Sequence, residues 1–192
     1  MNNEIIKYKK QLNEAFHKAT GGSRIVLYNH DKAHNACVMQ FMLSNSQHIR
    51  MFCGTASAFK KSFYDSIGVD SQDTTGIELR DATESAIREF FKVKTNGLEI
   101  IFEDENSIID AEYLCFDEFI AARLSGQLKL YRLDSMARMA NLPHFSFCNT
   151  NIKRLEQDKV LHTAFCSFGG DGTEKYENNF ETLKANSLPI LQ

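Results

Sequence analysis

The chain has 192 residues, of which 43% are hydrophobic, so it is long enough to bury a sizeable core within one domain over residues 1–192. Its 22 Lys and Arg residues stand against 25 Asp and Glu residues, and this balance argues against a surface that attracts polyanions broadly. The cysteines fit neither a disulfide framework nor a zinc site, because they are odd in number and lack CxxC spacing. We therefore expect reduced thiols, no metal and no cofactor. The charged first residues and the absence of an apolar run of about 18 residues predict a cytoplasmic protein without membrane insertion.

The first half of the chain alternates between helical and strand-like patterns. Apolar residues at helical spacing predict a helix over 4–20 that ends at two glycines and could lie at the periphery of the domain. A strand over 24–28 then leads into a helix that begins at Asp31, and a strand over 49–53 leads into a helix through residue 67. This order predicts successive strand-helix units.

The second half continues the alternation and then changes its rhythm. A loop is expected over 68–76, and Asp81 with Glu84 resembles a capping box that starts the next helix. The remaining expected elements are a strand over 98–102, a helix over 111–124, a strand over 128–133, a short helix over 135–142, strands near 144–148, 152–156 and 162–168, and a last helix around 176–183. Together these patterns predict an α/β fold with a mixed sheet flanked by helices.

Polar residues follow the first two predicted strands, where ligands bind in open α/β sheets. Asp31 is most simply a helix N-cap, whereas His30 or Lys32 could face a ligand. The turn over 54–57 could hold a phosphate on free backbone N–H groups, but an ordinary turn explains it better. The glycines of 169–173 lack the GK[ST] of a phosphate loop, and the sequence holds no HExxH, GxSxG or GxGxxG motif.

The stretch from residue 144 to residue 168 holds the densest set of candidate ligand-binding side chains. A period of two places Arg154 and Glu156 on one face of a strand, either as an ordinary ion pair or as an arginine fork for a phosphate or carboxylate that Glu156 orients. His144 and His162 head the neighbouring strands and could join this site, although a structural role is the simpler interpretation of each histidine.

This region resembles the C-terminal part of a phospholipase D-like domain, whose motif is HxKxxxxD. With His144 as the histidine of that motif, the lysine position falls on Ser146 and the aspartate position on Asn151. The Gly-Ser pair expected further on is replaced by residues 157–159. The resemblance implies a phospholipase D-like three-layer sandwich whose motif is degenerate.

The resemblance also implies a chemistry and an assembly. In active members the histidine attacks a phosphodiester, the lysine binds the phosphate, and two motifs meet across a twofold axis. One motif in this chain therefore implies a homodimer. The lost lysine favours a domain that does not catalyse but binds a phosphate-bearing ligand, nucleic acid among the options, through Arg154, Glu156, His162, Asn151, His30 or Lys32.

Two other functions stay open from the sequence. The first is an active, metal-independent phosphodiesterase or nuclease that uses His144 as its nucleophile. The second is a structural interaction subunit, which would be favoured if the face carrying Arg154 and Glu156 were buried between two copies.

Overall fold

The computed structural model describes residues 2–68, 73–104, 106–134 and 142–190. The strands within these ranges are β1 (Ile25–Asn29), β2 (His48–Cys53), β3 (Gly97–Phe102), β4 (Leu128–Leu133), β5 (Phe145–Cys148), β6 (Ile152–Asp158), β7 (Thr163–Phe168) and β8 (Ser187–Pro189). The helices are α1 (Asn3–Thr20), α2 (Lys32–Asn45), α3 (Lys61–Asp65), α4 (Thr75–Lys92), α5 (Phe116–Leu124) and α7 (Thr173–Ala185), with a 3-10 turn, η1 (Ser57–Phe59).

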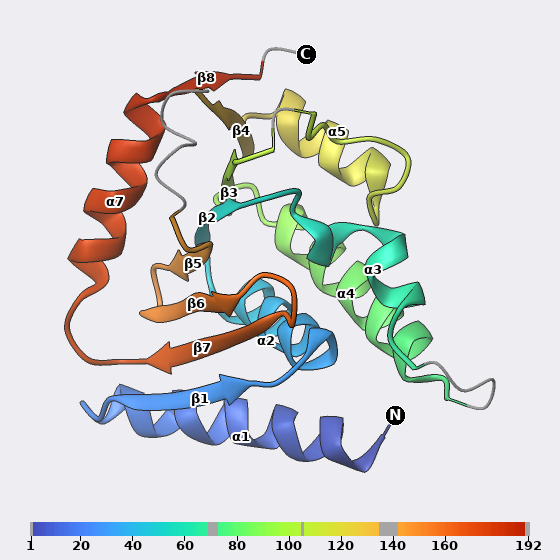
Figure 1. Ribbon diagram of the computed structural model, residues 1–192, viewed down its shortest axis with the longest axis vertical. Helices are drawn as coiled ribbons and strands as arrows, with labels where there is room; N and C mark the ends of the chain where they lie inside the picture. Colours follow the sequence, from blue (N-terminus) through green and yellow to red (C-terminus); the bar gives the residue numbers. More distant parts are fainter. Residues whose placement is uncertain (1, 69–72, 105, 135–141, 191–192) are drawn as a thin grey trace.

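All these strands belong to one mixed sheet with the order β1-β7-β6-β5-β2-β3-β4-β8. β2, β3 and β4 are parallel to one another, and the other neighbours pair antiparallel. Helices cover both faces, as Figure 1 shows, so the predicted α/β architecture with a mixed sheet between helices is confirmed. The strand β8, which pairs with β4 at one edge, was not expected from the sequence.

The two faces of the sheet bury separate hydrophobic clusters because side chains alternate along each strand. On β2, Ile49 and Met51 join the larger cluster, to which α1, α2, α4 and α5 contribute. Phe52 faces the other way and joins the smaller cluster with Phe180 and Leu183 of α7. This alternation fixes which strand residues can reach the helices on each side.

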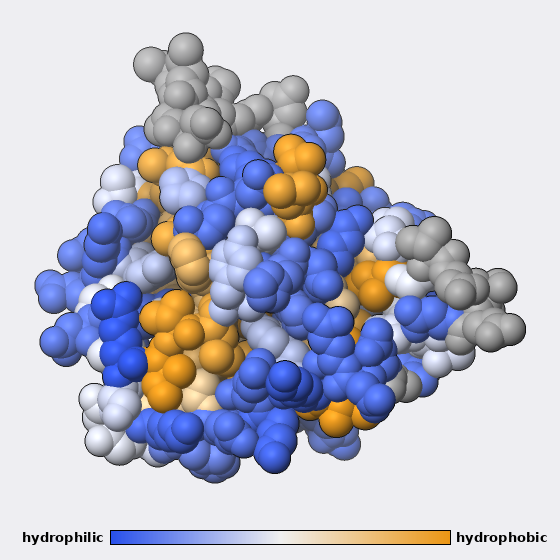
Figure 2. Space-filling view, turned by 60° about the horizontal axis from the view of Figure 1, so that its bottom comes forward, coloured by the Kyte–Doolittle hydropathy of each residue, from blue (hydrophilic) through white to orange (hydrophobic). Residues whose placement is uncertain are grey.

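One part of the sheet keeps an apolar surface toward solvent. Val26 and Tyr28 on β1 and Phe165 on β7 are all exposed, and the rings of Tyr28 and Phe165 lie 5.3 Å apart. Figure 2 turns the side of the molecule that holds α1 and β1 toward the reader and shows an apolar area among hydrophilic surroundings. No helix among the described residues is both long and apolar enough to cross a membrane.

Helix α4 begins earlier than the sequence predicts. Residues 73–76 were expected to belong to a loop, but the Asp73 carboxylate accepts from the Thr75 N–H and the helix starts there. Gly76, which the sequence suggested as a loop residue, lies inside the helix. An added Cβ at this position would come within 2.5 Å of the carbonyl oxygens of Tyr64 and Ile67. The glycine therefore serves close packing rather than a turn.

Helix α5 is shorter than expected, because residues 111–115 are not helical. Cys115 adopts a left-handed conformation with φ of 51°, which interrupts any helix that would run through it. The backbone before it bonds elsewhere, since the Leu114 N–H donates to the Phe59 carbonyl and Tyr113 pairs with Lys60. The helix expected after residue 53 is likewise divided into η1 and α3. The short helix predicted over 135–142 lies outside the described residues except for Leu142.

Candidate functional site

A cleft of about 220 Å³ opens where β2 ends and β5 begins. His144, Arg154, Glu156 and His162 line it together with Lys159, so four of the sequence candidates converge there. Met39, Met51 and Phe63 contribute an apolar wall. The site lies beyond the carboxyl end of β2, where open α/β sheets place their ligands.

The pairing of β5 with β6 brings the polar residues together. Phe145 pairs with Leu155 and Ser146 with Arg154, and the Glu156 N–H donates to the His144 carbonyl at 2.9 Å. The period of two then places Arg154 and Glu156 on the same face of β6. Their side chains form an ion pair of 3.3 Å, as the sequence alternation allowed.

Both ring nitrogens of His144 contact carboxylates. Nδ1 lies 2.6 Å from Glu156 Oε2, and Nε2 lies 2.8 Å from Glu103 Oε2. Lys159 Nζ also donates to Glu103 Oε2 at 2.8 Å. Since an ionised carboxylate only accepts, two such contacts require a proton on each ring nitrogen, and the arrangement suits a doubly donating imidazolium.

Both carboxyl groups are held in their charged form. Burial alone would raise the pKa of Glu156, but the hydrogen bond from His144 and the charge of Arg154 outweigh it and lower that pKa. Burial acts in the same way on Glu103, where hydrogen bonds from Lys159 and His144 lower the pKa. Negatively charged and basic side chains therefore alternate here, with Glu156 between Arg154 and His144 and with Glu103 between His144 and Lys159.

A chain of amide and hydroxyl groups ties Arg154 to the first helix. Arg154 Nε donates to Asn35 Oδ1 at 3.0 Å, and Asn29 Nδ2 donates to the same oxygen at 2.9 Å. The Tyr8 hydroxyl in α1 donates in turn to Asn29 Oδ1. Burial raises the pKa of Tyr8, so its hydroxyl keeps the proton that this contact needs. The guanidinium is thus positioned through three elements of the fold.

His162 lines the cleft, and Lys32 lies beside it. The His162 carbonyl accepts from Asn35 Nδ2 at 2.5 Å, and burial together with the charge of Lys32 lowers the pKa of the His162 ring. Lys32 flanks the cleft, where its Nζ donates to Ser66 Oγ and lies 5.8 Å from the centre of the Phe63 ring.

His30 and Asn151 are not brought to the cleft. The His30 ring packs against Tyr28 with 4.6 Å between ring centres. Asn151 lies in the turn between β5 and β6, at the other end of these strands, where it accepts from Lys153 Nζ at 2.6 Å. Lys153 also donates to the Gly169 carbonyl, so the glycine-rich segment before α7 anchors a buried lysine.

The turn candidates have structural roles. Asp31 caps α2, accepting from the His34 N–H at 2.9 Å, as its simpler interpretation predicted. The segment after β2 enters η1, a turn of only three residues, which matches the ordinary turn of the sequence interpretation. Among the cysteines only Cys53 lines the cleft, and burial raises the pKa of its thiol to about 12, which makes it a poor nucleophile. Nowhere in the described ranges do three or more His, Cys, Asp or Glu side chains gather as a metal ion requires.

Sequence reasoning missed Glu103, Lys159 and Asn35. Glu103 carried a usable signal, because it directly follows β3, and the carboxyl ends of the parallel strands β2 and β3 share one edge of the sheet. Lys159 and Asn35 carried none, because one lies in a hairpin turn and the other within a helix. Their roles depend on the pairing of distant elements.

No family model matches the sequence, and no curated protein matches it. The fold, however, has relatives among solved structures. Nuc from Salmonella typhimurium, a phospholipase D family member, matches with a TM-score of 0.51 at 10% identity over 88% of this chain and 99% of its own. NucT from Helicobacter pylori matches with a TM-score of 0.50 at 8% identity over the same shares. The fold is phospholipase D-like.

The archaeal chromatin protein TrmBL2, whose structure shows a novel mode of DNA binding, is also similar. Its TM-score is 0.54 at 13% identity, and the match covers 97% of this chain. The chain spans only 64% of the length of TrmBL2. At such low identities the likenesses to Nuc and NucT establish the phospholipase D-like architecture, and no activity follows from any of the three.

Proposed function

We propose that this chain is a phospholipase D-like domain with a degenerate motif that holds a phosphate-bearing ligand in the cleft without cleaving it. The carrying observation is that both ring nitrogens of His144 contact carboxylates, at 2.6 Å from Glu156 and 2.8 Å from Glu103. A nucleophilic histidine needs a free lone pair on one nitrogen, and this arrangement occupies both.

Arg154 is the group that contacts the ligand phosphate. It lies across the strand pair from Ser146, the position where the family motif would carry lysine. Its side chain is 14% exposed, and Asn35 and Glu156 fix its Nε and one terminal nitrogen, so the guanidinium is oriented before a ligand arrives. A planar, oriented fork of this kind suits a phosphate oxygen pair.

Glu103 occupies the place of a ligand oxygen. Its carboxylate accepts from His144 and from Lys159, the pair of donors that an anion entering the cleft would meet. Glu103 is more exposed than Glu156, at 22% against 9%, and follows the end of β3. An arriving phosphate therefore displaces Glu103 and takes over its two hydrogen bonds.

A titration tests this exchange. Inorganic phosphate, AMP, glycerol phosphate and a short single-stranded oligonucleotide are each titrated into the full chain by calorimetry. We expect Arg154→Gln to weaken binding at least about tenfold and Glu103→Gln to tighten it by a similar factor, since each changes one charge-assisted contact. Glu174→Gln on α7 is the matched control, because it makes the same change at an exposed site.

Binding that is unchanged by both substitutions at the cleft would contradict the proposal. So would the absence of binding to every probe by a chain whose thermal unfolding is normal. Weaker binding by the Glu103→Gln variant would contradict the displacement step, because Glu103 would then contact the ligand instead of competing with it.

Nucleic acid is the larger ligand that this cleft could hold. The likeness to TrmBL2, which binds DNA, supports it, whereas the net charge of −3 limits how many phosphates the surface can contact. Arg154, Lys159 and Lys32 would contact only a few phosphates. We therefore expect the affinity for the oligonucleotide to depend only moderately on salt. The logarithm of its binding constant should fall by about 2 to 3 for each tenfold rise in salt concentration.

A second function is supported by one contact. The buried Glu156 carboxylate 2.6 Å from His144 Nδ1 would orient the ring and stabilise its positive charge, as a base-orienting group does in nucleophilic catalysis. If His144 is a nucleophile, removing the Glu103 charge should raise metal-independent hydrolysis of bis-p-nitrophenyl phosphate, and His144→Asn should abolish it. No turnover by the Glu103→Gln variant would exclude this function.

We further propose that the chain forms a homodimer, as its phospholipase D-like resemblance implies. Val160 and Leu161 support a contact beside the cleft, because they are 85% and 66% exposed in the hairpin turn next to Lys159 and His162. Sedimentation of the wild type and of Val160→Lys, Leu161→Lys distinguishes the states. A wild-type monomer at high micromolar concentration would contradict the dimer.

A further inference from the structure

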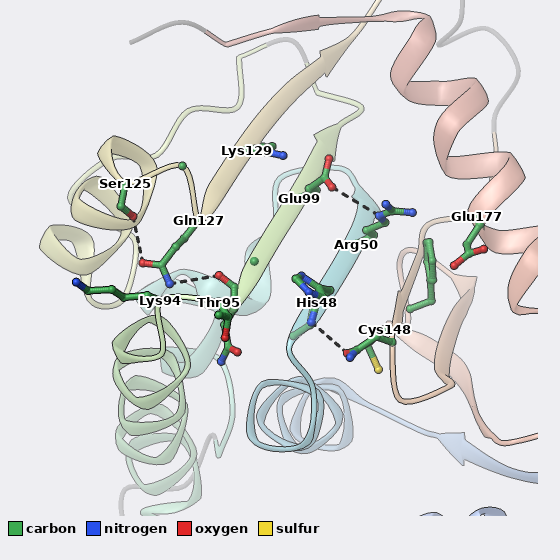
Figure 3. A pocket seen from close by; sticks show the side chains of 16 residues that line it. His48, Arg50, Lys94, Thr95, Glu99, Ser125, Gln127, Lys129, Cys148 and Glu177 are labelled. Carbon is green, nitrogen blue, oxygen red and sulfur yellow. Dashed lines mark hydrogen bonds and ion pairs between the residues drawn. The ribbon is translucent and has the colours of Figure 1, made fainter.

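A second and larger groove lies at the opposite end of the parallel strands. Its volume is about 430 Å³, and the residues that line it include His48 and Gly97, the first residues of β2 and β3 (Figure 3). The cleft around His144 lies beyond the last residue of β2 instead. The five steps of about 3.3 Å from His48 to Cys53 give β2 a length of roughly 17 Å, and Arg154 is not among the residues that line the groove.

Gly97 lines this groove, and because it has no side chain it leaves space there. Gly97 pairs with His48 on one side, and on the other side Leu98 pairs with Leu128, which brings Gln127 beside Gly97. An added Cβ at position 97 would lie 3.3 Å from His48 Nδ1. The glycine thus leaves a hollow between two polar neighbours, and its backbone lies outside the left-handed region.

The next row of residues across the strands carries charge. Arg50, Glu99 and Lys129 are neighbours on β2, β3 and β4. The Glu99 carboxylate accepts from Lys184 at 2.6 Å and lies 3.6 Å from Arg50. Burial alone would raise the pKa of Glu99, but the hydrogen bond and charge of Lys184 and the charges of Lys129 and Arg50 lower it. Lys129 lines the groove on the same side of the sheet as Glu99 (Figure 3), and it has no ion pair or hydrogen bond among the described residues.

Most polar groups of the lining already have partners. The Gln127 amide donates to three carbonyl groups of the segment before β3, and the Ser125 hydroxyl donates to the Ala122 carbonyl. Asn149 Oδ1 accepts from the backbone N–H groups of Gln47 and His48. The lining side chains that keep donors without a partner in the described structure include the His48 ring, Lys94 and Lys129.

We propose that this groove is a second anion site, which binds the phosphate group of a small phosphomonoester. Lys129 donates to the phosphate oxygens from β4, and the His48 ring donates from β2. Gly97 provides the room for the phosphate between His48 and Gln127. Glu177 of α7 is the opposing carboxylate of the lining, and a hydroxyl of the ligand can donate to it.

NMR titration of the isotopically labelled full chain tests this site. Inorganic phosphate, AMP and a short single-stranded oligonucleotide are added separately while the Gly97 amide and the His48 ring are followed. We expect both signals to shift with AMP, and Lys129→Gln to weaken the affinity about tenfold. Gly97→Ala should weaken it as well, because the methyl group fills the hollow. Lys175→Gln, on α7 outside the groove, should leave the affinity unchanged.

The outcomes separate this site from the cleft. Arg154→Gln should keep the response of Gly97 and His48, so the second site can stand even if the cleft binds nothing. A stronger response to AMP than to the oligonucleotide supports a small phosphomonoester, and a response to the oligonucleotide alone overturns that ligand. Signals that do not move, or an affinity that neither Lys129→Gln nor Gly97→Ala changes in a folded chain, would overturn the site itself.

Discussion

Arg154 lies directly opposite Ser146 in the ladder between β5 and β6. The two residues share the face of the sheet that carries Glu156, but Ser146 is buried beneath α2, where its hydroxyl lies 3.7 Å from Met42 Sδ. Ser146 is therefore enclosed by the core, and the cation at this point of the ladder comes from the neighbouring strand.

This relationship predicts that a lysine at position 146 would destabilise the chain. Ser146→Lys would place an ammonium group against Met42 without a partner, so we expect the free energy of unfolding to fall by about 3 kcal/mol or more. Ser146→Ala should cost less than about 1 kcal/mol. Urea denaturation of both variants measures the difference. A Ser146→Lys chain as stable as the wild type would show that the lysine can reach the cleft.

The lowered pKa values of Glu103 and Glu156 predict a loss of stability in acid. A carboxyl group whose pKa is lower in the folded state stabilises the fold above its unfolded pKa, near 4.5, and loses that contribution as the pH falls through the lowered value. Urea denaturation at several pH values below about 5 measures this slope. Glu156→Gln should flatten it, and an unchanged slope in that variant would contradict the assignment.

The contact between Tyr8 and Asn29 predicts that the loss of one hydroxyl group in the first helix lowers the stability of the fold. Tyr8→Phe removes the donor to a buried amide oxygen, so we expect a loss of about 1–3 kcal/mol in the free energy of unfolding. Tyr28→Phe, which removes the hydroxyl of an exposed ring, is the control and should change it by less than about 0.5 kcal/mol. Equal effects of the two substitutions would contradict a special role for Tyr8.

The position of Gly76 predicts that Gly76→Ala changes the stability of the chain in the direction opposite to the one that helix propensity gives. Replacing a glycine inside a helix with alanine ordinarily stabilises the helix by about 1 kcal/mol. At position 76 the new Cβ would lie 2.5 Å from two carbonyl oxygens, so we expect Gly76→Ala to destabilise the chain by about 1–3 kcal/mol. Thermal and urea unfolding check the sign. Stabilisation would show that α3 and α4 pack further apart.

The sequence was sufficient where the deciding interactions are local. Residues 128–133 were predicted as a strand with the bounds that β4 has, because a short segment rich in apolar residues between turn signals is a local pattern. The pairing of Arg154 with Glu156 followed from a period of two. The sequence failed at Gly76 and Cys115, where packing between distant segments decides the backbone.

The same distinction divides the candidate site. His144 and Glu156 could be brought together from the sequence, since a hairpin joins their strands. Glu103 and Asn35 could not, because they reach the site only after β3 and α2 have taken their places in the sheet and on it. His30 was chosen because it follows the first predicted strand, and Asn151 because it falls on the aspartate position of the motif that the region resembles. The β1–α2 connection and the β5–β6 turn carry them away from the cleft.

The spacing of the cleft residues along the chain also bears on the order in which the site forms. His144 and Glu156 are 12 positions apart, whereas 41 positions separate His144 from Glu103 and 119 separate Arg154 from Asn35. Closing a short loop costs less chain entropy than closing a long one, so the histidine-glutamate contact can form with its hairpin early in folding. The arginine acquires its fixed orientation only when the first and last thirds of the chain have docked. A late folding step therefore separates a chain with the paired histidine from one whose guanidinium is held in place.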